Sequence, residues 1–324
     1  MRPFHVRNVL LTALVPFLSA DITSAAAPDQ RLLSLVPPGA LIVAGMNAPS
    51  PKGQPDSFVL VTHNNTADLA DFFALSGVDD SRNIHQVILV ATADRTGGLR
   101  EHSLLASGNF DQARIYRSAG DLGASISHYR ALTVLVVQPF ARERGRFNDV
   151  RWLAILDSNV LLFGTTASVQ QELDRHLAHS ATDPSLMKKL ARLRRDDETW
   201  CVLSVPAQNV EIRNALWALD PKLADLVQDG DAFQFGIRYG RHIEFEYEVN
   251  TASSIDTQTI SNSLAQTLAG PQAKGSSLLP SPAMNSDRGS VHDVVRISIA
   301  QYEAWLAVVL ARSRARFVAD LSRH

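Results

Sequence analysis

Short apolar runs separated by polar turns recur along the chain and predict a fold rich in β-strands. Many of these runs contain β-branched residues and lie close together, with connections such as Asp157-Ser158-Asn159 between them. Closely spaced strands joined by short polar turns indicate a largely antiparallel sheet. In the first half of the chain the runs cover residues 40–45, 58–62, 84–92, 102–107, 126–129, 132–138, 150–156 and 159–164.

Helical periodicity and capping residues predict four helices in the same half. They cover residues 29–36, stopped by Pro37-Pro38, then 64–77, 111–119 and 168–178. The last opens with Ser168 followed three residues later by Gln171, which is the pattern of a capping box. The stretch Gly120-Asp121-Leu122-Gly123 follows a helix, so we interpret it as a C-terminal cap and not as a phosphate loop.

After residue 182 the pattern changes to fewer strands and longer helices. A charged helical stretch over residues 184–195 is followed by Asp196-Asp197-Glu198, which suits a solvated connector. The sequence therefore predicts an α+β fold, with two modules of mainly antiparallel sheet and helices packed on one face. The expected divisions are a signal peptide at 1–26, an N-terminal module at 27–182, a connector at 183–198 and a C-terminal module at 199–324.

Residues 233–249 predict a β-hairpin with one apolar face. Keeping every apolar side chain on that face requires Arg238 to lie opposite Glu244, with Gly240-Arg241-His242 as the loop. The opposite face then carries a row of glutamates, for which we expect a solvated surface; a site for a hard cation is the alternative. This row consists of Glu244, Glu246 and Glu248.

The first thirty residues resemble a secretory signal peptide. Arg2 and Arg7 precede an apolar run at 9–20, and Ser24-Ala25-Ala26 supplies small residues for cleavage after Ala26. The apolar run is shorter than the roughly 20 residues of a membrane helix. We expect an exported chain, periplasmic or secreted, with no transmembrane segment after signal cleavage.

Composition narrows the range of partners. The chain has 31 Lys and Arg against 33 Asp and Glu, a balance that argues against a dedicated nucleic-acid binder. Its single cysteine, Cys201, excludes an intramolecular disulfide, and the flanking apolar residues predict an inert position in a buried strand.

One set of side chains has a spacing that a metal ion could use. Glu172, His176 and His179 are four and three residues apart, so a continuous helix would carry them on neighbouring positions. Two histidines at the end of a helix also complement its dipole, and the spacing lacks the His-Glu-x-x-His pattern of metalloproteases. We therefore assign no metal, with these three residues as weak candidates.

Familiar catalytic signatures are missing from the sequence. It contains no Gly-x-Ser-x-Gly elbow, no phosphate loop ending in Gly-Lys-Ser or Gly-Lys-Thr, no Gly-x-Gly-x-x-Gly and no Cys-x-x-Cys. We assign no catalytic residue and no cofactor. The leading hypothesis is a non-enzymatic binding or scaffold protein of the cell envelope, and the alternative is a hydrolase or metal-dependent enzyme of an unfamiliar type.

Core packing does not explain the sheet edges or two loops, and these are candidate contacts with an unknown envelope protein or ligand. Residues 270–289 are rich in Gly, Pro and Ser. Residues 139–149 combine aromatic and guanidinium groups of the kind that anchor interfaces. The candidates in this second loop are Phe140, Arg142, Arg144, Arg146 and Phe147.

Several short motifs resemble those of exported bacterial proteins of unknown function. They are LLSLVPPGA at 32–40, GNFD at 108–111 entering a helix, and Leu162-Phe163-Gly164 entering another, so the likeness covers about residues 32–177. In those proteins a glycine often follows the tyrosine near Tyr129, where this chain has Arg130-Ala131. The resemblance implies an extracytoplasmic α+β protein and assigns no catalytic residue.

Overall fold

The computed structural model of the chain describes residues 27–47, 83–93, 101–138, 150–194, 197–204, 232–238, 242–250 and 290–300. The chain divides into two compact units, residues 1–204 and 205–324. The signal peptide expected at 1–26 lies outside the described residues. Within these residues, no helix combines the length and apolar character needed to cross a membrane.

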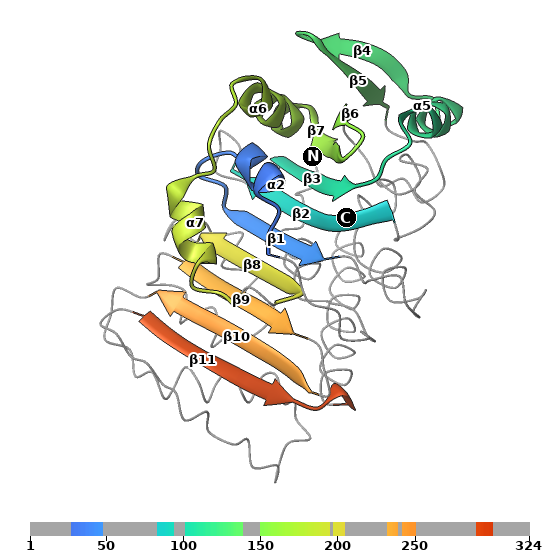
Figure 1. Cartoon of the computed structure of the whole chain (residues 1–324). Coiled ribbons are helices and arrows are strands. Elements are labelled where there is room, and N and C mark those ends of the chain that lie inside the picture. The colour runs from blue at the N-terminus through green and yellow to red at the C-terminus, as the bar shows by residue number, and fades with distance from the viewer. Residues whose placement is uncertain are drawn as a thin grey trace, which may run out of the picture. The chain divides into compact units, whose positions relative to one another are not determined.

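The first unit contains eight described strands in the order β8-β1-β2-β3-β7-β6-β5-β4, and each neighbouring pair is antiparallel (Figure 1). The strands β1 to β7 lie within about two residues of the apolar runs that predicted them, and β8 is the buried strand expected around Cys201. Their bounds are β1 Ile42–Asn47, β2 Ile84–Thr92, β3 Glu101–Gly108, β4 Ser125–Tyr129, β5 Leu132–Val137, β6 Arg151–Asp157, β7 Val160–Thr165 and β8 Thr199–Ser204.

The second unit contains β9 (Ala232–Arg238), β10 (Ile243–Asn250) and β11 (Ser290–Ile297) in its described part. β10 pairs antiparallel with both of the others. Glu244 lies opposite Arg238, which confirms the predicted register of the hairpin. The apolar side chains of β9 and β10 that the structure describes are buried, as the alternation required; they are Phe233, Phe235, Ile237, Ile243, Phe245 and Tyr247.

The predicted fold class is wrong. The eleven described strands belong to a single sheet, in the order β11-β10-β9-β8-β1-β2-β3-β7-β6-β5-β4, and the helices among the described residues are few. The prediction assigned the strand beginning at Thr199 to a second module. That strand, β8, instead pairs with β1, with Ile42 opposite Leu203. Such a pairing joins distant parts of the chain, and the order of apolar runs does not reveal it. The predicted domain boundaries remain predictions.

Four helices lie in the described part of the first unit: α2 (Gln30–Leu35), α5 (Gln112–Asp121), α6 (Thr166–Leu177) and α7 (Pro184–Leu190). Figure 1 shows α2 and α6 over the strands, where α6 contacts β3, β6 and β7. α6 begins two residues before the predicted capping box, because the Thr165 hydroxyl accepts from the Ser168 amide. α5 ends at Asp121, two residues beyond the predicted end, and Gly123 is left-handed (φ 84°) after the last turn.

Both faces of the central strands are buried. The face under α2 and α6 joins them in one apolar cluster, and the alternate residues of the same strands are also buried. This double burial explains why the strands read as continuous apolar runs in the sequence. Examples from the first face are Val43, Ile88, Leu105 and Leu162, and from the second Ile42, Leu89, Leu104 and Phe163.

Candidate functional site

The structure does not bring Glu172, His176 and His179 together. Glu172 is fully buried, His176 is half-buried and His179 is exposed. The helix ends at Leu177, and His179 is left-handed (φ 47°), with its amide donating to the His176 carbonyl. This helix end resembles a Schellman motif, so His179 leaves the helical face that the spacing assumed. Among the described residues, no three His, Cys, Asp or Glu side chains form a metal site.

Glu172 is instead a buried carboxyl group between α6 and the sheet. The Ser103 hydroxyl on β3 donates to Glu172 Oε1, and within the described part of the chain Oε2 has no hydrogen-bond partner. Burial raises the pKa of Glu172 to about 8, although the hydrogen bond from Ser103 opposes the rise. The group is therefore a neutral acid at pH values below about 8, with no exposed surface.

Gly164 on β7 allows the close approach of strands beside this carboxyl. It lies opposite Ser103 in the ladder between β3 and β7. A Cβ atom at position 164 would lie 2.5 Å from the His102 carbonyl oxygen and 2.7 Å from Ser103 Cα. Both are backbone atoms of a central strand, so neither can move aside cheaply, and glycine is required here by space.

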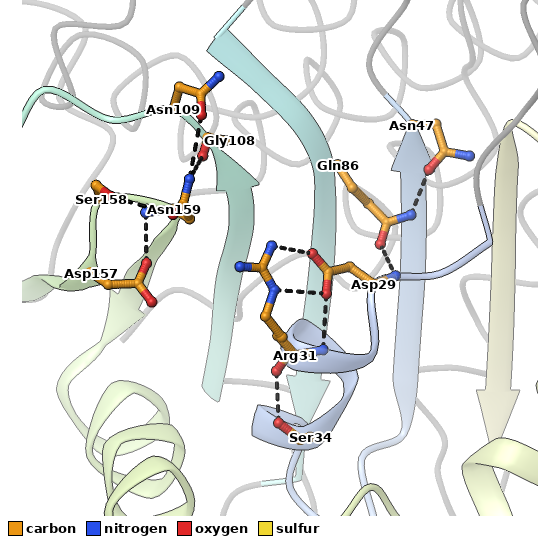
Figure 2. A network of polar contacts seen from close by, with 10 residues as sticks. All are labelled: Asp29, Arg31, Ser34, Asn47, Gln86, Gly108, Asn109, Asp157, Ser158 and Asn159. Carbon is orange, nitrogen blue, oxygen red and sulfur yellow. Dashed lines mark hydrogen bonds and ion pairs between the residues drawn. The ribbon is translucent and has the colours of Figure 1, made fainter.

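A polar network ties the N-terminal segment to the sheet (Figure 2). Asp29 caps α2, since its Oδ1 accepts from the Arg31 amide at 2.9 Å, and its own amide donates to Gln86 Oε1 at 2.7 Å. Gln86 Nε2 then donates to Asn47 Oδ1 at 2.5 Å. Burial alone would raise the pKa of Asp29, but its hydrogen bonds and charge interaction with Arg31 leave that pKa lowered.

The other half of Figure 2 is built on the turn between β6 and β7. Asp157 Oδ1 accepts from the Asn159 amide at 2.6 Å, and Asn159 Nδ2 donates to the Gly108 carbonyl at 2.9 Å. The turn therefore also fixes the end of β3. This confirms Asp157-Ser158-Asn159 as a strand connection, and these polar side chains serve the backbone.

The β4–β5 hairpin is fastened to α6 through Asp174. Asp174 Oδ1 accepts from the Tyr129 hydroxyl at 3.0 Å and lies 3.0 Å from the Arg130 guanidinium. Arg130 is left-handed (φ 53°) in the two-residue turn. Glycine adopts this conformation without the steric cost that a side chain adds. Tyr129 also packs edge-on against Trp152 at 5.7 Å between ring centroids.

The strand β4 is the terminal strand of the first unit, and in the described part of the chain it pairs with β5 alone. It combines two serines with Ile126, which is 65% exposed, and it has no Asp, Glu, Lys or Arg. Edge strands that avoid association usually contain charges, proline or a bulge. β4 has none of these features.

The register identifies which backbone groups of β4 face away from β5. Tyr129 lies opposite Leu132 across a two-residue turn, which makes that pair a hydrogen-bonded one. Hydrogen-bonded and non-hydrogen-bonded pairs alternate along an antiparallel ladder. The amide and carbonyl groups of Ile126 and His128 therefore point toward the open edge. This edge, residues 125–129, is the candidate binding element.

The sequence predicted a strand at 126–129 but did not identify it as an edge. The sequence does contain a pattern that indicates an edge strand. One large apolar residue among serines differs from the continuous apolar runs of the central strands. The loop candidates Phe140, Arg142, Arg144, Arg146 and Phe147, and the loop at 270–289, lie outside the described residues.

The glutamate row of β10 is not the solvated face that we expected. Glu246 and Glu248 are buried, and Glu244 is half-buried. Two of these carboxylates have partners on the neighbouring strands: Glu244 pairs with Arg238 and Arg296, and Glu246 Oε1 lies 2.7 Å from His292 Nε2. The pKa of Glu244 is lowered, because the arginine hydrogen bonds and charges outweigh the effect of burial. No metal cluster is formed among the described residues.

Cys201 on β8 is fully buried, as the sequence predicted. Burial raises the pKa of its thiol above the ordinary value, so the thiolate needed for nucleophilic chemistry is disfavoured.

Comparison with known proteins gives no match: no family model, curated protein or solved structure is detectably similar to this chain.

Proposed function

We propose that this protein is an exported, non-enzymatic binding or scaffold protein of the cell envelope, and that it binds an extended partner segment at the edge of β4. The observation that carries this proposal is the open, uncharged edge of β4 with Ile126 exposed on it. An extended segment can add to such an edge through main-chain hydrogen bonds, and side chains on alternate positions then add specificity.

Two further features support a binding role. Asp174 fixes the turn of the hairpin through Tyr129 and Arg130, so β4 is held in a defined position before a partner arrives. A preformed strand loses less conformational entropy on binding than a loop would. In contrast, Glu172 and Cys201, the groups with the most strongly raised pKa values among the described residues, are fully buried.

Export is supported by the sequence of the first 26 residues and is compatible with the network at Asp29. The contacts of Asp29 with Gln86 and Arg31 involve no residue before position 27, so cleavage after Ala26 would leave them intact. The test is the mass of the N-terminal peptide of the protein recovered from the envelope. A mature chain that begins at Ala27 is expected, and one that begins at Met1 would overturn the export.

The binding role is tested by a photo-crosslinking amino acid placed at His128 in cells that express the full chain. We expect a crosslinked product from position 128 and none from Arg192, which is exposed in the short segment after α7. The substitution Ile126→Lys, which adds a charge to the edge, should abolish the product. If position 128 gives no crosslink, or gives one that Ile126→Lys leaves unchanged, β4 is not the binding element.

A further inference from the structure

We propose that the partner of β4 is a second copy of this chain, paired antiparallel with β4 about a twofold axis at Ser127. The inference rests on the proposed binding role of this edge and names its occupant. It is carried by the self-complementary register of the strand, by its lack of charge and by the place of its one exposed apolar side chain.

The first argument is the pattern of hydrogen-bonding groups. The outward amides and carbonyls belong to Ile126 and His128, which flank Ser127 symmetrically. A twofold axis at Ser127 places Ile126 of one copy opposite His128 of the other, and the reverse. Both residues of each pair then offer a donor and an acceptor, and four main-chain hydrogen bonds form. Ser127 faces its own copy as a non-hydrogen-bonded pair.

The second argument concerns side chains. Residues directly opposite each other in an antiparallel pair lie on the same face, and diagonal neighbours are also within reach. The axis at Ser127 makes the two Ile126 side chains diagonal neighbours, so each covers part of the apolar surface that the other exposes. Pairing of two identical strands places identical residues near each other, so charged residues would repel. Residues 125–129 contain no Asp, Glu, Lys or Arg, and the pairing is therefore tolerated.

Such an interface is small. One pair of five-residue strands buries less than the roughly 1,200 Å² of a standard stable interface, so association should be weak and dependent on protein concentration. Sedimentation equilibrium of the full chain should therefore show a monomer at low concentration and a dimer at high concentration. Ile126→Lys should weaken dimerisation by about tenfold or more, because it replaces an apolar contact with two neighbouring like charges.

A cysteine substitution tests the register directly. The Cα atoms of a non-hydrogen-bonded antiparallel pair are about 4.5 Å apart, which lies within the range that a disulfide spans. We expect Ser127→Cys to form a disulfide-linked dimer under mild oxidation. The matched variant Ser125→Cys should not, since the axis sets its two copies more than about 10 Å apart. The native Cys201 is buried and does not compete.

The outcomes separate this inference from the proposed function. Dimerisation that Ile126→Lys weakens, together with crosslinking at 127 and not at 125, supports the second copy. A chain that stays monomeric at high concentration overturns it, as does equal crosslinking at both positions. If such a monomer still gives the His128 photo-crosslink with a different protein, the binding role survives and the second copy fails. Circular dichroism of each variant verifies that the fold is retained.

Discussion

The central strands β3 and β7 and the edge hairpin β4–β5 each contain a position that restricts which residue can occupy it. The cause of the restriction differs between the two regions. In the centre, Gly164 is required because a side chain would strike the backbone of β3. At the edge, Arg130 occupies a left-handed turn position that glycine would fit more easily, and Asp174 and the Tyr129 ring hold its side chain. The lack of space determines the residue at position 164, whereas polar contacts stabilise the residue at position 130.

The two regions also differ in the surroundings of their carboxyl groups. Glu172 in the centre is sealed among apolar side chains with one hydroxyl partner, whereas Asp174, two residues further along the same helix, is half-buried and has two partners. Burial without a counter-charge raises the free energy of ionising a carboxyl group. An exposed ion pair has a small desolvation penalty, but it stabilises the fold only weakly. Perturbations in the centre should therefore cost several times more than those at the edge.

The largest expected effect is the pH dependence caused by Glu172. Its folded pKa of about 8 lies above its ordinary value of 4.5, so between these values the folded protein binds the extra proton. This contribution to stability is complete below about pH 4.5 and declines as pH rises toward 8, by at most about 1.4 kcal/mol per unit. Glu172→Gln should remove the decline, measured by urea unfolding between pH 5 and 8, and gain roughly 3 kcal/mol relative to wild type over that range.

Ser103→Ala sharpens this test. The hydroxyl of Ser103 lowers the pKa of Glu172, so its loss should extend the decline to higher pH. Parallel profiles for wild type and Glu172→Gln would show that the carboxyl is ionised in the folded protein without penalty.

The next effect is Gly164→Ala, which we expect to lower the free energy of unfolding by about 3 kcal/mol, because the new methyl group overpacks against the His102 carbonyl. The same substitution at Gly120 is the control. Gly120 lies in α5, and a methyl group there would meet no atom within 4 Å, so Gly120→Ala should stabilise the protein by about 0.5 kcal/mol. Urea midpoints that shift alike for both would contradict the close packing at β3 and β7.

At the edge, Arg130→Gly and Arg130→Ala should change stability in opposite directions. Both lose an exposed ion pair worth about 0.5 kcal/mol, but glycine also removes the cost of the left-handed conformation, about 1 kcal/mol. We expect a small gain for glycine and a small loss for alanine in thermal unfolding. If glycine is the less stable of the two, the contacts of Arg130 outweigh its backbone strain.

The smallest effect is that of Ile126→Lys on the isolated monomer. Ile126 is 65% exposed, so the free energy of unfolding in dilute solution should change by less than about 0.5 kcal/mol. A larger loss would mean that Ile126 contributes to the fold itself, and its substitution would no longer report on association alone.

The sequence predicted elements well where burial is strongest. The run at 84–92 coincides with β2, because a strand buried on both faces reads as a continuous apolar segment. The order of strands was not predictable, since the pairing of β1 with β8 joins segments far apart in the chain and leaves no local pattern. The single sheet follows from such pairings, which explains why the expected fold class is wrong.

The candidate site was predicted only in part. The spacing of Glu172, His176 and His179 assumed a helix that continued through all three, but it ends at Leu177. Burial of Glu172 depends on packing against β3, which periodicity does not report. The importance of β4 depends on its place at the end of the strand order, so a sequence that predicts the strand still does not reveal the open edge.

The close approach at Gly164 has an evolutionary consequence. Drift can replace most residues of this chain by others of similar size, but position 164 admits no larger side chain while the residue opposite it stays on the same ladder. Position 130 can exchange arginine for glycine, because glycine fits its left-handed conformation and only an exposed ion pair is lost. A diverged descendant of this protein should therefore retain glycine after the aromatic residue of β7 long after the ion pair at the hairpin has been lost.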